Sequence, residues 1–163
     1  MIRKIAVAIF VLALMLTLST ALAQNTPPLR GVKTIQVDPT VVSDPQKVKE
    51  ETAPNLVQDG LKNALQAASI ELGDGAPIRA HIVLDEFTSG STAKRVMVGM
   101  GSGRSTVTCH LIFQDAAGKE LANVRIHVRG NLAFSPYEGN DTQKRQAVSS
   151  FDKRLIEEIE KLQ

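Results

Sequence analysis

The sequence contains one cysteine, Cys109, so no disulfide can form within the chain. The fold must therefore be held together by the packing of apolar side chains. A single thiol could also react or pair with a second chain, but its place among alternating apolar residues favours a small buried side chain. A lipoprotein would carry a cysteine at position 24 for acylation after processing. Gln24 stands there, and we expect no lipid anchor.

The chain also lacks an excess of charge. It has 19 Lys and Arg against 17 Asp and Glu, and two of the basic residues, Arg3 and Lys4, lie in the N-terminal segment. Without that segment the two signs balance. Nucleic-acid binding requires clustered, uncompensated positive charge, so we expect no nucleic-acid partner.

Familiar nucleotide-binding and catalytic motifs are missing as well. A P-loop would need a glycine at Val98 and a lysine at Arg104. A dinucleotide-binding loop would be followed by a helix, whereas here a predicted strand follows the glycines. Ser102 lacks the flanking glycines of a hydrolase nucleophile elbow. We find no nucleophile with a recognisable base and no acid–base pair of carboxylates, and we predict no catalytic residue and no cofactor.

One long apolar run is present, at the N-terminus. Arg3 and Lys4 precede unbroken apolar residues 5–16, and the segment ends in the small-x-small sequence Ala21-Leu22-Ala23. This order is typical of a secretory signal peptide. We expect residues 1–23 to be removed near Ala23-Gln24 and the protein to be exported, either to the periplasm or to the medium. An uncleaved anchor is the alternative, although the run is shorter than the roughly 20 residues that span a bilayer.

Periodicity in the remaining chain predicts both strands and helices. Alternation of apolar and polar residues predicts strands over residues 32–37, 78–87, 106–113 and 120–129. Apolar residues at three- and four-residue spacing predict helices over residues 46–70 and from residue 140 onwards. After a flexible leader at residues 24–31, we expect a single α+β domain over residues 32–163. Its predicted fold is a two-layer sandwich in the order β-α-β-β-β-α, with two helices on one face of a mainly antiparallel sheet of about four strands.

Three local signals refine this fold. Pro54 either lies in the first turn of the first helix or kinks a longer one. Residues 115–118 have the Asp and Gly positions of a tight turn. Leu121 is out of phase with Val124, which predicts a bulge near residues 122–123.

The segment between the second and third predicted strands is rich in glycine. Gly99, Gly101 and Gly103 recur at every second residue. Glycines let backbone amides approach an anion, and Arg95 and Arg104 would add positive charge. Glycines also permit sharp bends and close packing of two strands, which is the more common role. Both explanations stay open, and these five residues are the predicted ligand-binding residues.

The same region carries a family resemblance. It rests on Phe87-Thr-Ser-Gly90, then Arg95, then Gly-Met-Gly-Ser-Gly-Arg-Ser over residues 99–105 and Asp-Ala-Ala-Gly-Lys-Glu-Leu over residues 115–121. In this spacing the sequence resembles a bacterial family of exported proteins, domain of unknown function 4410 (DUF4410). The resemblance is clearest over residues 82–130. It implies an envelope location and a small α/β fold, and it supplies no activity. Many members are lipoproteins, and this chain departs from them by lacking the acylated cysteine.

The three histidines, His81, His110 and His127, fall on the polar side of their predicted strands. The turn at residues 115–118 places His110 opposite residue 123 or 124, and His127 opposite residue 106 or 107. The two imidazoles are then offset by about four residues, roughly 13 Å at the rise of a strand, which is too far for one zinc ion. We therefore predict no metal site.

Arg79, Arg125 and Arg129 share this polar side of the predicted sheet. They could form a cationic surface for an anionic polymer or a partner protein, or an ordinary solvated face with cross-strand pairing to residues such as Asp85. Together with export and the missing catalytic motifs, this favours a non-enzymatic accessory or binding module of the cell envelope. Its expected partner is an envelope protein or an anionic polymer. The alternatives are a small exported hydrolase with an unrecognised site and a structural subunit that forms homo-oligomers through an exposed edge strand.

Overall fold

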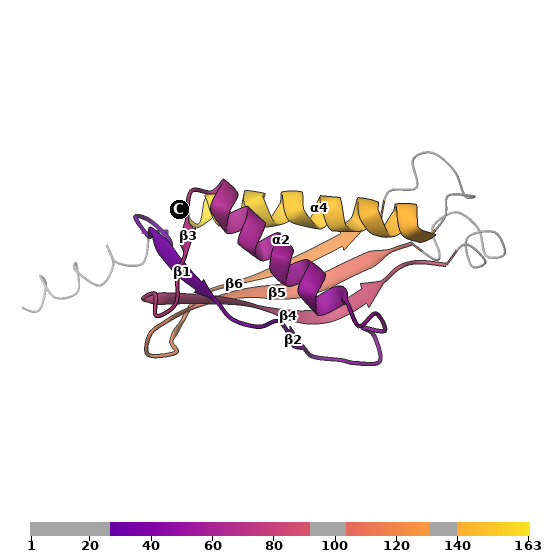
Figure 1. Ribbon diagram of the computed structural model, residues 1–163, viewed down its shortest axis with the longest axis horizontal. Helices are drawn as coiled ribbons and strands as arrows, with labels where there is room; N and C mark the ends of the chain where they lie inside the picture. The colour runs from indigo at the N-terminus through magenta and orange to yellow at the C-terminus, as the bar shows by residue number, and fades with distance from the viewer. Residues whose placement is uncertain (1–26, 92–103, 131–139) are drawn as a thin grey trace, which may run out of the picture.

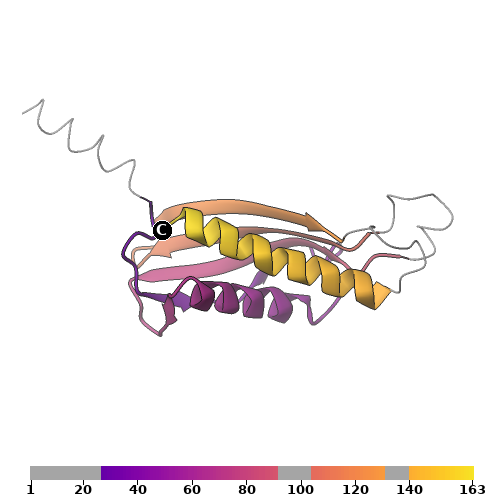
Figure 2. The ribbon, with the colours of Figure 1, turned by 90° about the horizontal axis from the view of Figure 1, so that it is seen from above.

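A mixed sheet and two helices make up this computed structural model, which describes residues 27–91, 104–130 and 140–163 (Figure 1). The elements, labelled as in Figure 1, are β1 (Thr34–Val37), β2 (Val41–Val42), α2 (Ala53–Ala67), β3 (Glu71–Leu72), β4 (Ile78–Thr88), β5 (Thr106–Asp115), β6 (Glu120–Arg129) and α4 (Asn140–Lys161). Both helices lie on one face of the sheet (Figure 2). The predicted α+β class is therefore confirmed.

The sheet differs from the prediction in strand number and direction. It has six strands in the order β3-β1-β4-β5-β6, with β2 also paired to β4. The β1/β3, β1/β4 and β2/β4 pairs are parallel, and only β4, β5 and β6 form the expected antiparallel meander. Helix α2 carries the chain back over the sheet, so β4 runs in the same direction as β1. Strands β2 and β3 have two residues each, which is too short for alternation to reveal them.

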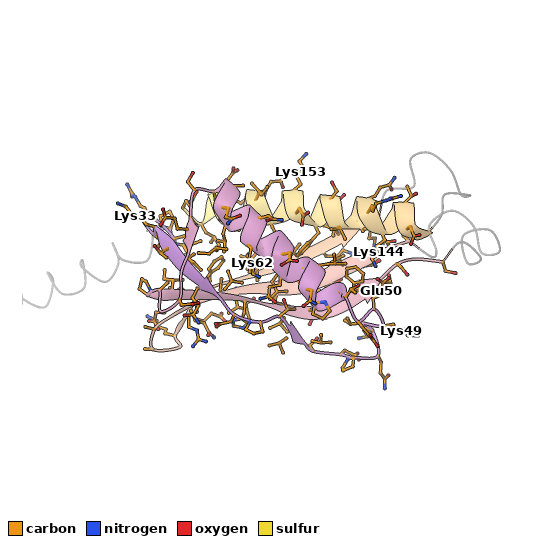
Figure 3. The ribbon with its side chains drawn as sticks, viewed as in Figure 1. Lys33, Lys49, Glu50, Lys62, Lys144 and Lys153 are labelled. Carbon is orange, nitrogen blue, oxygen red and sulfur yellow. The ribbon has the colours of Figure 1, made fainter. Side chains whose placement is uncertain are left out.

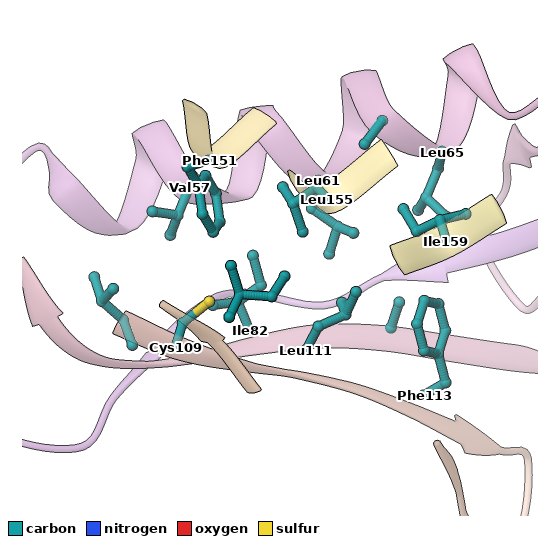
Figure 4. Packing of buried hydrophobic residues seen from close by; sticks show 14 of the residues in the cluster. Val57, Leu61, Leu65, Ile82, Cys109, Leu111, Phe113, Phe151, Leu155 and Ile159 are labelled. Carbon is teal, nitrogen blue, oxygen red and sulfur yellow. The ribbon is translucent and has the colours of Figure 1, made fainter. Parts of the chain in front are cut away.

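The core lies between the helices and the inner face of the sheet (Figure 4). Alternation correctly predicts the buried positions of β4 and β5, including Ile82, Cys109, Leu111 and Phe113. The helices contribute Val57, Leu61 and Leu65 from α2 and Phe151, Leu155 and Ile159 from α4. Each of the larger side chains contributes roughly 1.5–3 kcal/mol when it is fully buried.

Helix α2 is shorter than the predicted span of residues 46–70. It begins at Ala53 with Pro54 in its first turn, where the missing amide hydrogen is not needed. The preceding residues form turns instead, and Val48 makes an isolated parallel bridge to Phe87 at the end of β4. The helix ends at Ala67, and a left-handed residue, Ser69, with φ of 61°, follows shortly after it.

The β5–β6 hairpin forms through the predicted turn. The amide of Gly118, whose φ is +82°, donates to the Asp115 carbonyl at 2.9 Å. The predicted bulge is also present, but it lies at Leu121, because Phe113 pairs with Ala122 while Gln114 pairs with Glu120. This extra residue shifts the register of the rest of β6.

Both ends of the described domain meet at one end of the sheet. Leu29, within the segment expected to be a flexible leader, is buried, and its amide donates to the Leu162 carbonyl at 2.8 Å. The predicted signal peptide at residues 1–23 lies outside the described residues. Within the part of the chain that the structure describes, no helix is long and apolar enough to cross a membrane.

Candidate functional site

Both helices lie on one face of the sheet, and the other face is its outer face (Figure 2). The polar residues that alternate with the buried ones along β4, β5 and β6 lie on this outer face. His110 lies near its middle. Its Nδ1 is 3.0 Å from Asn123 Oδ1, and its Nε2 is 3.6 Å from Asp85 Oδ2. The Ser43 hydroxyl donates to Asp85 Oδ1 at 2.7 Å. The Asp85 carboxylate thus lies between the Ser43 hydroxyl and the His110 imidazole. A nucleophilic serine needs the imidazole within hydrogen-bond distance of its own hydroxyl, so these three residues do not have the order of a catalytic triad.

The register of the hairpin differs from the predicted one because of the bulge at Leu121. His110 lies opposite Arg125 and His127 opposite Thr108. The two histidines are therefore offset by two residues rather than four, and each has its own polar neighbour. His127 Nδ1 is 2.8 Å from the Thr108 hydroxyl. Among the described residues, no group of three His, Cys, Asp or Glu side chains is placed to hold a metal ion.

The three arginines of the polar face have different surroundings. Arg79 donates two hydrogen bonds to Asp38, at 2.8 and 2.9 Å, and its charge is compensated. Arg125 and Arg129 are exposed on the edge strand β6, and neither makes an ion pair within the described part of the chain. Of the cationic surface predicted for this face, only Arg125 and Arg129 on the β6 edge keep an uncompensated charge among the described residues.

A hollow of about 520 Å³ lies at the end of the sheet where β4 ends and β5 begins. Its walls come from the turn at residues 46–50, from residues 86–91, and from Arg104 and Thr106. On one side, Lys144 of α4 pairs with Glu50, and its ammonium lies 5.8 Å from the centroid of the Phe87 ring (Figure 3). Glu50 and Lys144 are 94 residues apart, so no local sequence signal could have paired them.

Arg104 is the described member of the predicted ligand-binding set. It lines the hollow, and its Nε is buried without a hydrogen-bond partner among the described residues. Its carbonyl accepts a hydrogen bond from the Thr88 hydroxyl at 3.4 Å, and the neighbouring Ser105 hydroxyl donates to the Ser89 carbonyl at 2.7 Å. These bonds hold its backbone against the end of β4. The other four predicted residues, Arg95, Gly99, Gly101 and Gly103, lie outside the described residues.

Cys109 is fully buried in the core, as predicted. Burial, together with the nearby charge of Asp85, raises the pKa of its thiol to about 12. At neutral pH the sulfur is therefore protonated, and it lacks the thiolate character of a nucleophile.

Comparison with known families decides the assignment. The family model described as domain of unknown function (DUF4410) matches residues 30–132. The chain belongs to the DUF4410 family. No curated protein matches the sequence.

Solved structures extend the comparison of this DUF4410 fold. Two structures of the PelC dodecamer from Paraburkholderia phytofirmans are similar, with TM-scores of 0.55 and 0.53 at 14% and 13% identity. The first similarity covers 82% of this chain and 88% of the PelC chain, and the second covers 77% and 87%. Protein XCC0632 from Xanthomonas campestris, of family DUF330, has a TM-score of 0.50 at 10% identity, covering 76% of this chain and 81% of the other. At these identities the similarity shows a shared fold.

Proposed function

We propose that this DUF4410 protein is exported to the cell envelope and acts there as a non-enzymatic module assembled from several copies of itself. The observation that carries the proposal is the likeness of its fold to PelC, a dodecamer, over most of both chains. The signal-like N-terminus and the family assignment support the envelope location.

The sheet offers two different edges for such an assembly. Strand β6 lies at one edge and presents Arg125, His127 and Arg129, all exposed. Strand β3 lies at the other edge and has the exposed side chain of Glu71, followed by exposed Asp74. A ring that closes through head-to-tail contacts needs two distinct, complementary surfaces on each copy. Opposite charge at the two edges supplies that complementarity.

The apolar surface near the acidic edge also suits a contact between copies. Leu72 of β3 is 36% exposed and Val41 of β2 is 53% exposed, and these are the exposed large hydrophobic residues of the described chain. Both lie on the β1 side of the sheet, away from β6. We therefore propose that the β6 edge of one copy contacts the β2–β3 side of the next.

Sedimentation velocity on the processed protein, purified from cells that export it, tests this proposal. We expect one discrete oligomer. Reversing the basic edge with Arg125→Glu and Arg129→Glu should shift it toward monomer, because like charges would then face each other across the contact. Adding Glu71→Lys and Asp74→Lys should restore the oligomer.

The matched control is Lys153→Glu, which reverses an exposed charge on α4, away from both sheet edges (Figure 3). It should leave the sedimentation coefficient unchanged. A wild-type protein that stays monomeric at high concentration would overturn the assembly. An oligomer that withstands the reversal of the β6 edge would overturn the proposed contact.

A further inference from the structure

We propose that the contact between copies is a pairing of strands, in which β3 of one copy adds to the free edge of β6 of the next copy and continues the sheet. This inference rests on the proposed assembly and deepens it, because it names the backbone groups that join the copies. Strand β6 is a long edge of ten residues, whereas β3 has two. The backbone contact is therefore short, and side chains on both faces of the sheet complete it.

The free edge of β6 carries backbone groups that have no partner strand within one copy. The amide of Gly130 donates to the Ser105 carbonyl at 2.8 Å, and these two residues continue the register of the β5–β6 pair. Along an antiparallel pair, residues that bond to their opposite residues alternate with residues whose backbone groups point away. The inner-facing residues of β6 therefore bond to β5, whereas Arg125, His127 and Arg129 turn their N–H and C=O groups outward.

The outer edge of β3 carries one residue of the same kind. The amide of Glu71 donates to the Lys33 carbonyl at 2.8 Å. The amide of Gly73 donates to the Ile35 carbonyl at 3.1 Å, so both amides point toward β1. Between them, the N–H and C=O groups of Leu72 point away from β1, on the side where the sheet ends. A strand of a second copy at this edge would supply both groups with partners.

The two faces of the extended sheet also match. Leu72 pairs with Ile35 of β1, which is buried in the core, so Leu72 lies on the helix side of the sheet and Glu71 on the outer side. The basic residues of β6 share the outer side with Glu71, and the half-buried Val128 shares the helix side with Leu72. The pairing therefore brings opposite charges together on one face and apolar side chains together on the other.

The strand directions determine how the two edges meet. Strand β3 runs parallel to β1 and β4, and so does β6, because it is antiparallel to β5. A ring of many copies turns only slightly from one copy to the next, so the pairing is parallel. We place Glu71 opposite His127, because its carboxylate then lies between the two arginines of β6. Leu72 then lies opposite Val128. Its N–H donates to the His127 carbonyl, and its C=O accepts from the Arg129 amide.

Hydrogen exchange with residue resolution tests the pairing on the processed full-length protein, as the oligomer and as the monomer obtained by dilution. We expect the amides of Leu72 and Arg129 to exchange more slowly in the oligomer by roughly tenfold or more, because a bonded amide must open before it exchanges. The amide of Glu71 is bonded within one copy and should show no such dependence on assembly.

Leu72→Pro tests the same bond by mutation. It removes an N–H that points away from β1, and an edge strand tolerates proline where that side faces solvent. The variant should need about tenfold higher protein concentration to assemble, the upper end of the effect of one lost hydrogen bond. The matched control is Leu72→Val, which keeps the amide and a branched apolar side chain and should assemble like the wild type.

Thermal unfolding of dilute samples shows whether both variants fold, and exchange in the wild type decides the question if Leu72→Pro does not. Equal exchange of the Leu72 amide in oligomer and monomer would contradict the strand pairing. Assembly of folded Leu72→Pro at the wild-type concentration would contradict it as well, and either result leaves a contact through side chains intact. A wild type that never assembles overturns the pairing together with the assembly itself.

Discussion

Asp152 of α4 shows most clearly how a single residue is affected by its surroundings. One of its carboxylate oxygens, Oδ1, is buried without a hydrogen-bond partner among the described residues. Burial raises the pKa of this carboxyl group above its ordinary value of 3.8. It faces Gly60 of α2, where an added Cβ would lie 2.5 Å from Asp152 Oδ1, so the glycine makes room for the carboxylate between the helices.

The raised pKa of Asp152 predicts how stability depends on pH. The unfolded chain ionises this group at lower pH than the folded chain does, so ionisation favours unfolding. This loss of folding stability is absent at pH values below the pKa of Asp152 in the unfolded chain. It is complete at pH values above the pKa of Asp152 in the folded chain. Asp152→Asn should therefore raise the free energy of unfolding at pH 7, and the gain should shrink toward pH 3. Urea unfolding at both pH values measures it.

The control for this prediction is Asp59→Asn on the exposed face of α2, which should change stability only slightly at either pH. An equal gain for Asp152→Asn at pH 7 and pH 3 would mean that packing, and not ionisation, is responsible.

At the scale of elements, the end of α2 shows how a helix stops. The amide of Ser69 donates to the Gln66 carbonyl at 3.0 Å, and that of Ile70 donates to the Leu65 carbonyl at 2.9 Å. These two bonds form a Schellman motif, which requires a left-handed residue after the helix. Ser69 adopts that conformation, with φ of 61°, at a position where glycine is the usual residue.

Ser69→Gly should therefore stabilise the protein by roughly 0.5–1 kcal/mol, because glycine adopts a positive φ without steric cost. The same substitution at Ser149, exposed inside α4, should destabilise it by a few tenths of a kcal/mol, since glycine weakens a helix interior. Thermal unfolding of both variants checks the prediction. A loss of stability for Ser69→Gly would show that the serine side chain stabilises this turn.

At the scale of the whole molecule, both helices cover the same face of the sheet, and the outer face and both edges lie uncovered in the described structure. One-sided covering leaves surface for contacts between copies.

Export is the remaining prediction at this scale. Full-length protein produced in a bacterial host should appear in the periplasm or the medium with the intact mass of residues 24–163. Ala23→Phe should retain residues 1–23, because the residue before the cleavage site must be small. Leu22→Phe places the same ring at the tolerant middle position and should be processed normally. An unprocessed wild-type chain in the membrane fraction would support the uncleaved anchor.

Local patterns in the sequence were sufficient to predict the long elements. Alternation determined the inner faces of β4 and β5, because strand side chains repeat with a period of two. The signals at residues 115–118 determined the hairpin turn. Pro54 left two possibilities open, a helix start or a kink, and the structure shows the helix start. Among the residues that line the hollow, the sequence predicted only Arg104 as a ligand-binding residue, because it lies next to the glycines.

Tertiary structure alone decided the rest, because it depends on contacts between segments that are distant in the chain. Strands β2 and β3 exist only because neighbouring strands supply their hydrogen bonds. A single extra residue at Leu121 reset the partners of both hairpin histidines. The Glu50–Lys144 pair forms between residues that are 94 positions apart in the chain. Periodicity shows which face of a strand is buried, whereas packing sets what lies beside it.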